Sequence, residues 1–539
     1  MQLPSMKYAE RMSKSTQVKF RGLNHVLGAR DGDLWDMQNM TSDHYPVLST
    51  RAKRRKLTTL QNPGGLFAMQ GLCWVDGTGF YYNGEIRGNV SEGQKNFTAM
   101  GDYILIFPDK CWYNIATDTF GALESVWSGT QLTFCNGLLY GVDAEANTVL
   151  CEGVNWSEWF REGDAVTING CTANAANNIT EIIRGIDGNK LYFYENVFQL
   201  GTDGEYTETG TLSIRRSVPD LDQVCENESR LWGRSGNTVY ASKPRDIFNW
   251  NVYDGLESDA WAVDCASAGK LSGCVSFRGF PTFFKEDNIY KVYGSVPSEF
   301  EVMGSASLGV PEGSGNSLAI AGETLFYLSR NGVMAYTGGI PQLVSECFGT
   351  DRFRDGVAGS DGLKYYISMR NDAGEWWLYV YDTQKGMWHK EDQMRVTHFA
   401  RYEGNLYCLN DQGEIWIIGN IQSPPEESTL EEEIPFLVEF GDFTEEDPNK
   451  KGVGKLQVRI ELEEDASAQC WIQFDSSGEW THAGPLMLGD VKRSYTLPIV
   501  PTRCDHYRIR ITGTGGCRIF SLARESYSGS EVKSRKGMY

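Results

Sequence analysis

Two turns in the sequence combine an aspartate and a tryptophan at a spacing that could serve sugar chemistry. One runs from Asp372 to Trp377 and the other from Asp411 to Trp416, each as Asp-x-Gly-x-x-Trp. Cleavage of a glycosidic bond uses two carboxyl groups that flank the bond, and no such pair can be singled out among the 71 acidic residues. Asp-Gly turns and buried tryptophans also stabilise β-structure without any catalysis. The pattern therefore favours a structural role.

Other reactive side chains are sparse. The sequence contains no phosphate-binding Gly-x-x-x-x-Gly-Lys-Ser/Thr loop, no His-Glu-x-x-His motif and no Gly-x-Ser-x-Gly motif. Of six histidines, His389 and His398 lie near each other, but no carboxylate pair frames them, so we interpret them as structural or surface residues. We therefore expect no catalytic residue, no cofactor and no metal ligand, and hence no enzymatic activity.

Cysteine usage indicates the compartment in which the chain folds. The 13 cysteines are scattered singly and no Cys-x-x-Cys pair occurs, so a structural zinc site is not expected. Most lie inside apolar strands, where a cysteine behaves as a small apolar side chain. We interpret them as reduced core thiols, which indicates folding in a cytoplasm rather than along a secretory route.

Aromatic residues of the C-terminal region offer a different chemistry, the stacking of sugar rings. Four of them could form such a platform: Trp471, Trp480, Tyr495 and Tyr507. By strand alternation Trp471 shares a strand with apolar neighbours such as Ile472, so at least some of these rings are expected to pack in a core. Both interpretations, core packing and glycan binding, stay open.

The elements that position these residues follow from a recurring cassette: a glycine turn, an aromatic-rich alternating strand, a second turn and another alternating strand. Copies begin near residues 66, 97, 131, 226, 274, 317, 364 and 397. One such hairpin cannot bury its apolar face alone, so the copies must stack. Most intervals are about 30 to 50 residues, the length of a four-stranded propeller blade. We predict an all-β protein with a β-propeller of about seven or eight blades.

Interruptions of the cassette divide the chain. The long interval after the third copy alternates as strands do, which predicts a small β domain inserted into a loop. A shift to prolines and glutamates marks an acidic linker, and strict alternation beyond it predicts a C-terminal β-sandwich. The predicted divisions are an N-terminal extended assembly segment (1–60), the first part of the propeller (61–154), the inserted β domain (155–222), the second part of the propeller (223–420), the acidic linker (421–432), the β-sandwich (433–528) and a polar tail (529–539).

Charge and hydropathy restrict the partners. The net charge of −21 argues against a grip on nucleic acid through phosphate neutralisation, although it permits DNA to slide past an acidic wall. The one basic cluster, at residues 51–56, is interpreted as a solvated or subunit-facing turn. No apolar run is long enough to span a bilayer and the first 19 residues lack the pattern of a secretory signal, so we expect a soluble chain.

Several stretches resemble structural proteins of tailed bacteriophages and prophages of Gram-positive bacteria. The family-like stretches begin at Phe20-Arg-Gly-Leu-Asn24 and span most of the chain; five more are Arg216–Asp222, Cys225–Gly233, Tyr240–Trp250, Phe284–Gly294 and Arg503–Ile511. A looser similarity, through the turn at residues 241–250 and the architecture, links the chain to propeller proteins that plug or extend the portal of short-tailed phages, the packaged-DNA stabilisation or tail-nozzle group. The insertion and the C-terminal sandwich depart from the simpler members.

The resemblance implies a structural virion protein without catalytic activity. Such a protein would be assembled in the host cytoplasm and would form a homo-oligomeric ring at the portal–tail junction or in the virion tail. Its partners would be its own copies and other tail or connector proteins. DNA would pass through its channel without sequence-specific binding. The protein would have no membrane partner. Five residues are predicted at subunit interfaces: Phe20, Trp35, Trp156, Trp159 and Phe160.

Two alternatives remain from the sequence. One is a receptor- or glycan-binding tail protein that uses the C-terminal aromatic residues or a propeller face. The other is a propeller hydrolase, whose hallmark turn begins with a serine two residues before the aspartate; Arg370 and Leu409 stand at these positions. A hydrolase would also need a pocket with convergent carboxyl groups of perturbed pKa.

Overall fold

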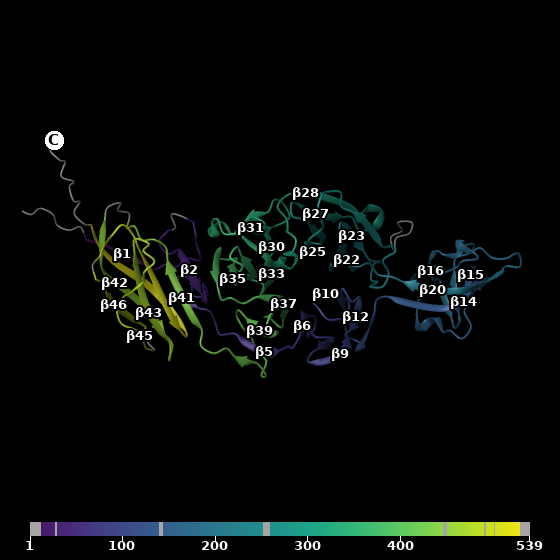
Figure 1. Cartoon of the computed structure of the whole chain (residues 1–539), viewed down its shortest axis with the longest axis horizontal. Coiled ribbons are helices and arrows are strands. Elements are labelled where there is room, and N and C mark those ends of the chain that lie inside the picture. Colours follow the sequence, from purple (N-terminus) through teal and green to yellow (C-terminus); the bar gives the residue numbers. More distant parts are fainter. Residues whose placement is uncertain are drawn as a thin grey trace, which may run out of the picture. The chain divides into compact units, whose positions relative to one another are not determined.

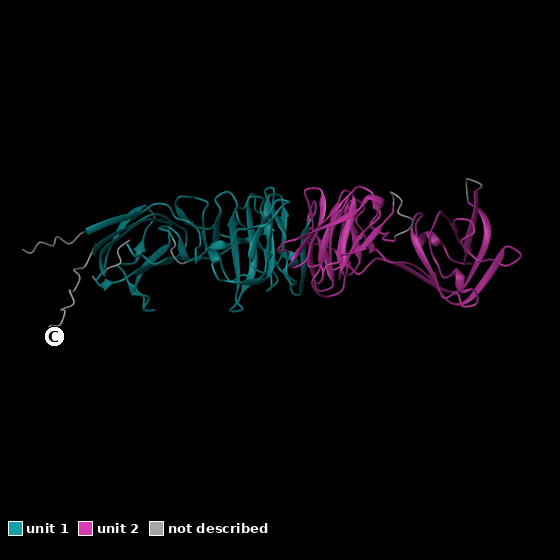
Figure 2. Ribbon diagram, turned by 90° about the horizontal axis from the view of Figure 1, so that it is seen from above, with its two compact units in different colours: residues 1–68, 310–539 teal, residues 69–309 magenta. Residues whose placement is uncertain are grey.

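The computed structural model describes residues 12–26, 30–139, 144–251, 259–445, 450–489, 492–500 and 502–528. The chain forms two compact units, one made of Met1–Ala68 with Val310–Tyr539 and the other of Met69–Gly309 (Figure 2). The described residues form strands and five single-turn 3-10 helices, at Trp156–Glu158, Ala175–Asn177, Pro297–Glu299, Gly315–Ser317 and Glu346–Phe348. The prediction of an all-β protein is confirmed. The predicted tail, residues 529–539, lies outside the described residues.

Two sheets of the first unit, the terminal sheets, combine strands from both ends of the chain. In the first, the order is β3-β4-β49-β42-β46, with β1 paired to β49 and β47 to β42. In the second it is β2-β41-β48-β43-β44, with β45 paired to β43. Their strands are β1 (Met12–Gln17), β2 (Leu34–Gln38), β3 (Met40–Thr41), β4 (Leu48–Thr50), β41 (Pro435–Phe440), β42 (Lys451–Leu462), β43 (Ser467–Phe474), β44 (Thr481–His482), β45 (Met487–Leu488), β46 (Arg493–Pro498), β47 (Arg503–Cys504), β48 (Tyr507–Thr514) and β49 (Cys517–Ser528).

The N-terminal segment was predicted as an extended assembly segment, whereas its described strands pair within the chain. Strand β2 pairs with β41, and β4 pairs with β49, so that Leu34 and Leu48 are buried inside the chain's own core. The physical reason is alternation: Leu34 and Met37 of β2 point to one side of the sheet and complete a core built mainly by C-terminal strands.

Three further sheets of the first unit each contain a hairpin of the cassette. Two have four strands in sequence order, and the third has the order β37-β38-β39-β5-β40. Figure 1 labels β31, β35 and β39, one strand of each sheet. Their strands are β29 (Ala319–Ala321), β30 (Thr324–Ser329), β31 (Gly332–Tyr336), β32 (Gln342–Leu343), β33 (Phe353–Ser360), β34 (Lys364–Asn371), β35 (Trp376–Asp382), β36 (Met387–Lys390), β37 (Val396–Tyr402), β38 (Asn405–Asn410), β39 (Glu414–Ile418), β5 (Arg55–Thr59) and β40 (Thr429–Leu430). Because β40 pairs with β5, the predicted acidic linker 421–432 is partly built into this sheet.

Four sheets of the same antiparallel, sequential type follow β5 along the chain as far as the end of the second unit. Their strands are β6 (Pro63–Ala68), β7 (Leu72–Asp76), β8 (Gly79–Tyr82), β9 (Glu85–Asn89), β10 (Asn96–Met100), β11 (Tyr103–Phe107), β12 (Cys111–Asn114), β13 (Thr119–Ala122), β21 (Gln223–Asn227), β22 (Arg230–Ser235), β23 (Thr238–Ala241), β24 (Trp261–Asp264), β25 (Gly273–Phe277), β26 (Phe280–Phe284), β27 (Asn288–Tyr293) and β28 (Glu301–Ala306).

The inserted domain is larger than predicted and begins earlier. It is one sheet with the order β17-β16-β20-β14-β15-β19-β18. Its strands are β14 (Ser125–Leu139), β15 (Ala144–Leu150), β16 (Ala165–Asn169), β17 (Thr180–Ile182), β18 (Gly185–Asp187), β19 (Lys190–Phe193) and β20 (Glu205–Arg216). The prediction placed residues 61–154 in the propeller, which is wrong for residues 125–154 because β14 pairs with β15 on one side and with β20 on the other.

Burial explains why the cassette copies stack. The second strand of several sheets is buried on both faces, as in β11, β30 and β38, where nearly every residue is inaccessible to solvent. A strand with one face open to water would alternate between buried and exposed residues, whereas continuous burial requires packing on both faces. The sheets therefore cover one another within each unit. None of the described helices is long and apolar enough to cross a membrane.

Candidate functional site

Three of the five residues predicted at subunit interfaces are buried inside the chain. Phe20 is 2% exposed beside Phe440, and Trp156 and Phe160, at 0% and 2%, belong to the core of the inserted sheet. Large aromatic side chains are the main apolar material of these cores, so the prediction is wrong for these three.

The other two predicted residues remain accessible. Trp159 is 39% exposed on the inserted domain. Trp35 is half-buried, with the Arg508 guanidinium 4.8 Å from its ring centroid. The structure thus does not bring the five predicted residues together.

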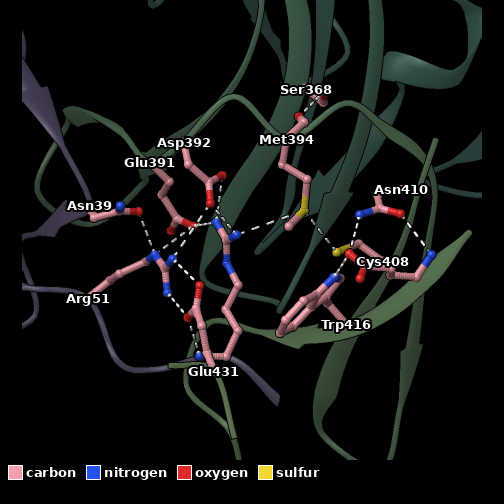
Figure 3. Close-up of polar contacts among 12 residues, drawn as sticks. Asn39, Arg51, Ser368, Glu391, Asp392, Met394, Cys408, Asn410, Trp416 and Glu431 are labelled. Atoms are coloured by element: carbon pink, nitrogen blue, oxygen red, sulfur yellow. Dashed lines mark hydrogen bonds and ion pairs between the residues drawn. The ribbon is translucent and has the colours of Figure 1, made fainter. Parts of the chain in front are cut away.

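A cluster of buried charges in the first unit was not predicted. We call it the arginine joint, and it consists of Arg51, Arg54, Glu391, Asp392 and Glu431 (Figure 3). Arg51 binds both oxygens of Glu431, at 2.7 and 2.9 Å. Arg54 donates to Glu391 at 2.5 Å and to both oxygens of Asp392 at 2.6 and 3.0 Å. Such forked contacts match the planar guanidinium to carboxylates.

The pKa values of the joint follow from burial and opposite charge. Burial disfavours the charge of Arg54, which is 2% exposed, but Asp392 and Glu391 outweigh burial and hold its pKa well above its ordinary value. Burial likewise opposes ionisation of Asp392, yet Arg54 lowers the pKa of that carboxyl. Burial also tends to raise the pKa of Glu431, but the hydrogen bonds and the charge of Arg51 outweigh burial and lower it. Arg54, Asp392 and Glu431 are therefore charged at neutral pH.

The arginine joint ties together three distant parts of the chain. Its arginines lie between β4 and β5, Glu391 and Asp392 directly follow β36, and Glu431 directly follows β40. The basic cluster at residues 51–56 is thus not a solvated turn, since Arg51 and Arg54 are buried. The sequence does contain a basic run at residues 51–56 and an acidic run at residues 431–433. Arg51 and Glu431 are 380 residues apart, however, so the sequence alone does not show that they pair.

Beside the arginine joint, a second set of contacts fastens β5 and β38 to β39. Lys56 of β5 forms an ion pair with Glu414 at 3.1 Å. Glu414 also accepts hydrogen bonds from Asn410 and Trp416, each at 3.0 Å (Figure 3). The Asp411–Trp416 turn therefore serves as a structural turn, because its tryptophan is hydrogen-bonded within the sheet.

The Asp246–Trp250 turn, which belongs to a stretch that carried the family resemblance, fastens the inserted domain. The Asn249 amide donates to Asp164 at 3.1 Å and to Asp246 at 2.6 Å, and its oxygen accepts from the Ala165 amide N–H at 2.9 Å. Asp164 also forms a buried ion pair with Arg216, at the end of β20. The inserted sheet is thus anchored at both β16 and β20.

The ring of Phe248 completes this anchor, which we call the Phe248 joint together with Asp164, Arg216, Asp246 and Asn249. Arg161 and Arg216 lie against the ring, at 4.2 and 4.8 Å from its centroid. Tyr103 and Trp112 meet the ring edge-on at 6.4 and 6.1 Å. Cation–π and edge-to-face contacts are both favourable arrangements for an aromatic ring. A cleft of about 640 Å³ opens beside the joint.

A further cleft, of about 570 Å³, lies in the first unit and is lined by Trp35 and Trp377 together with polar groups. We call it the Trp35 cleft. On its wall His25 lies 2.6 Å from Asp351, and Lys390 covers the ring of Trp377 at 4.2 Å. The volume is within the range of small-ligand sites. Among the described residues that line this cleft and the cleft beside the Phe248 joint, no nucleophile is activated by an adjacent base.

The C-terminal aromatic residues do not form one platform. Tyr507 is buried in the core, and Tyr495 donates its hydroxyl to the Leu488 carbonyl at 2.6 Å. Trp471 packs edge-on against His482, and Arg510 covers one face of Trp480 at 4.0 Å. Among the described residues, no group of three or more His, Cys, Asp or Glu side chains is arranged to hold a metal ion.

The sequence matches no known family profile and no curated protein. Among solved structures, the chain is similar to BamB from Moraxella catarrhalis, with 10% identity and a TM-score of 0.34 over 70% of this chain and 99% of that chain. A Bacillus subtilis arabinoxylan arabinofuranohydrolase of glycoside hydrolase family 43 gives 8% identity and a TM-score of 0.16, over 87% and 96%. A Bacillus thuringiensis Cry1Da tryptic core variant gives 7% and 0.14, over 56% and 49%. These scores are too low to support a conclusion about function.

Proposed function

We propose that the seven antiparallel sheets form a seven-bladed β-propeller, with an inserted β domain and a β-sandwich built from the terminal sheets. The support is connectivity. Strand β5 belongs to the last sheet and ends at Thr59, and β6 begins the first sheet at Pro63. A link this short can span only about 10 to 15 Å, so the first and last sheets must be neighbours. A series of stacked sheets whose ends are neighbours closes into a ring.

We propose further that the chain is a structural virion protein of a tailed phage. In this role it forms an oligomeric ring at the portal–tail junction or in the tail, and helps to retain and conduct DNA. The observation that carries the proposal is the place of the phage-like stretches. Arg216 and the Asp246–Trp250 turn hold the inserted domain in the Phe248 joint. A structural protein that keeps its domains in place needs fixed contacts of this kind between them.

The first phage-like stretch, at residues 20–24, also has a structural role. Leu23 donates its backbone N–H to the Trp388 carbonyl at 2.8 Å, while Phe20 packs on Phe440. A methyl group at Gly22 would lie 2.4 Å from the same Trp388 carbonyl oxygen, so this position requires glycine. The stretch at residues 20–24 thus wedges between β36 and β41 and joins the terminal sheets to a cassette sheet.

The charge of the chain suits a conduit for DNA. A net charge of −21 repels phosphates, and burial of Arg51 and Arg54 removes two cations of the one basic cluster from the surface. DNA would therefore pass without being held.

Mass photometry of the full chain tests the ring. We expect the chain alone to form a discrete species of two or more copies at a multiple of 60.4 kDa, or to join a larger discrete complex after mixing with the portal and connector proteins of the same virion. Mass spectrometry of purified particles tests the location, and we expect peptides of this chain in tail-containing particles. A monomer under all these conditions, or absence from the particles, would refute the proposal.

The Trp35 cleft supports a second candidate, a glycan-binding tail protein. Two partly exposed indole rings with carboxylates, an amide and a lysine around them could stack on a sugar ring and bond its hydroxyls. A glycan array with the full chain separates the candidates. Specific binding that is lost in Trp35→Ala, from a chain that stays monomeric, would favour this second function.

A further inference from the structure

Cysteines 225 and 274 lie opposite each other on neighbouring sheets of the second unit. Strand β21 is at the edge of one sheet and β25 at the edge of the next. Hydrogen bonds connect the two strands on either side of Cys225: Gln223 accepts from the Cys274 N–H at 3.2 Å, and Ser276 donates to Asn227 at 2.7 Å. The two strands thus run side by side with Cys225 between these two contacts.

The thiols themselves are in contact. The Cys225 side chain is hydrogen-bonded to that of Cys274, and both belong to the same apolar cluster. Cys225 is a half-buried residue packed against the apolar cluster and Cys274 is 4% exposed, so the pair is largely shielded from solvent. A disulfide would require the two Cα atoms to lie within about 7 Å of each other.

We propose that Cys225 and Cys274 form an oxidation-dependent disulfide that locks two neighbouring sheets together. The co-reactant is a low-molecular-mass disulfide such as oxidised glutathione. The Cys225 thiolate attacks one sulfur of the reagent, forms a mixed disulfide and releases one glutathione thiolate. The Cys274 thiolate then attacks the Cys225 sulfur and releases the second. Two protein thiols are oxidised, one glutathione disulfide is reduced to two thiols, and the two thiol protons pass to the solvent or to these thiolates.

The surroundings keep this reaction slow under reducing conditions. The hydrogen bond to Cys274, together with burial, raises the pKa of the Cys225 thiol well above its ordinary value. Because only the thiolate attacks, few molecules react at neutral pH and more react as the pH rises. A reducing cytoplasm would keep both residues as thiols, and a medium that contains the oxidant would allow the cross-link to form. This inference stands independently of the proposed phage function.

Disulfide mapping of the full chain tests the proposal. The protein is incubated with oxidised glutathione at pH 7 and at pH 9, its free thiols are alkylated, and its peptides are identified by mass spectrometry. We expect the thiol count of the denatured chain to fall from 13 to 11, faster at pH 9, with a cross-linked peptide joining Cys225 to Cys274. Hydrogen exchange of β21 and β25 is expected to slow after oxidation.

Variants separate this pair from other cysteines. Cys225→Ser and Cys274→Ser should each abolish the cross-link, whereas Cys151→Ser, at another half-buried cysteine, should retain it. If a serine variant does not fold, Cys225→Ala replaces it, since alanine leaves no polar group unpaired. Retention of all 13 thiols at both pH values, or a dominant cross-link between other cysteines, overturns the proposal.

Discussion

The most quantitative prediction concerns a buried histidine beneath the N-terminal segment. His389 of β36 is 2% exposed, and neither of its ring nitrogens has a hydrogen-bond partner among the described residues. Burial lowers its pKa to about 4, and Lys364 adds to the effect, while Asp382 and Asp43 oppose it. The folded protein therefore holds this imidazole neutral where the unfolded chain would protonate it.

The size of the effect follows from linkage. An unfolded histidine has a pKa of about 6.5, so the folded value of about 4 is lower by about 2.5 units. Because the unfolded state binds the proton more tightly, stability falls as the pH drops below about 6.5, by about 2 kcal/mol at pH 5 and ~3.4 kcal/mol below pH 4. Asp382, whose pKa is lowered to about 2, contributes its own loss only at lower pH.

The variant His389→Leu removes the titration without leaving an unpaired polar group. Urea unfolding, followed through tryptophan fluorescence at half-unit steps from pH 7 to pH 4.5, measures the free energy of unfolding. We expect the variant to lose at least 1.5 kcal/mol less than the wild type between pH 7 and pH 5. His482→Leu, at an exposed site, should keep the wild-type slope. Parallel slopes for wild type and His389→Leu would refute the reasoning.

The other predictions use matched pairs of variants or a single structural readout. Arg54→Met leaves buried carboxylates uncompensated and should cost about 3 to 5 kcal/mol in urea unfolding, against about 0.5 kcal/mol or less for Lys53→Met. Gly413→Ala, whose methyl would lie 2.3 Å from the Leu60 carbonyl, should lower the melting temperature more than Gly374→Ala, which shares the positive φ but meets no atom within 4 Å; equal losses would contradict this. Asn249→Ala should cost about 1 to 3 kcal/mol and speed proteolysis between the inserted domain and β21; unchanged cleavage would count against the Phe248 joint.

The cassette made the all-β class predictable, because alternation and glycine turns act over a few residues. The same local character explains the wrong boundary of the insertion. Residues 135–150 alternate like any propeller hairpin, and only the pairing of β14 with β20, as at Trp127 and Ile214, assigns them to another sheet. Alternation states which face of a strand is buried but not which neighbour buries it.

Charge was harder to interpret than hydropathy. Arg54 stands in a run of basic residues that resembles a solvated turn, and its partner Asp392 lies 338 residues away. A buried ion pair has no local pattern, because each half would suit a solvated surface equally well. The prediction of interface aromatics failed for a related reason. Trp156 and Phe160 are apolar enough for either an interface or a core, and the structure places them in the core of the inserted sheet.

The joints also bear on which surfaces remain for contacts between copies. Strands β2 and β4 contribute Leu34 and Leu48 to the core of the terminal sheets, so a fragment that begins at residue 433 would expose the matching apolar side chains of β41 and β49. Binding and assembly are therefore properties to measure on the full chain. Within it, strands β1 to β4 of the N-terminal segment pair with other strands of the same chain, and Trp159 is the one predicted interface aromatic that keeps more than a third of its surface exposed among the described residues.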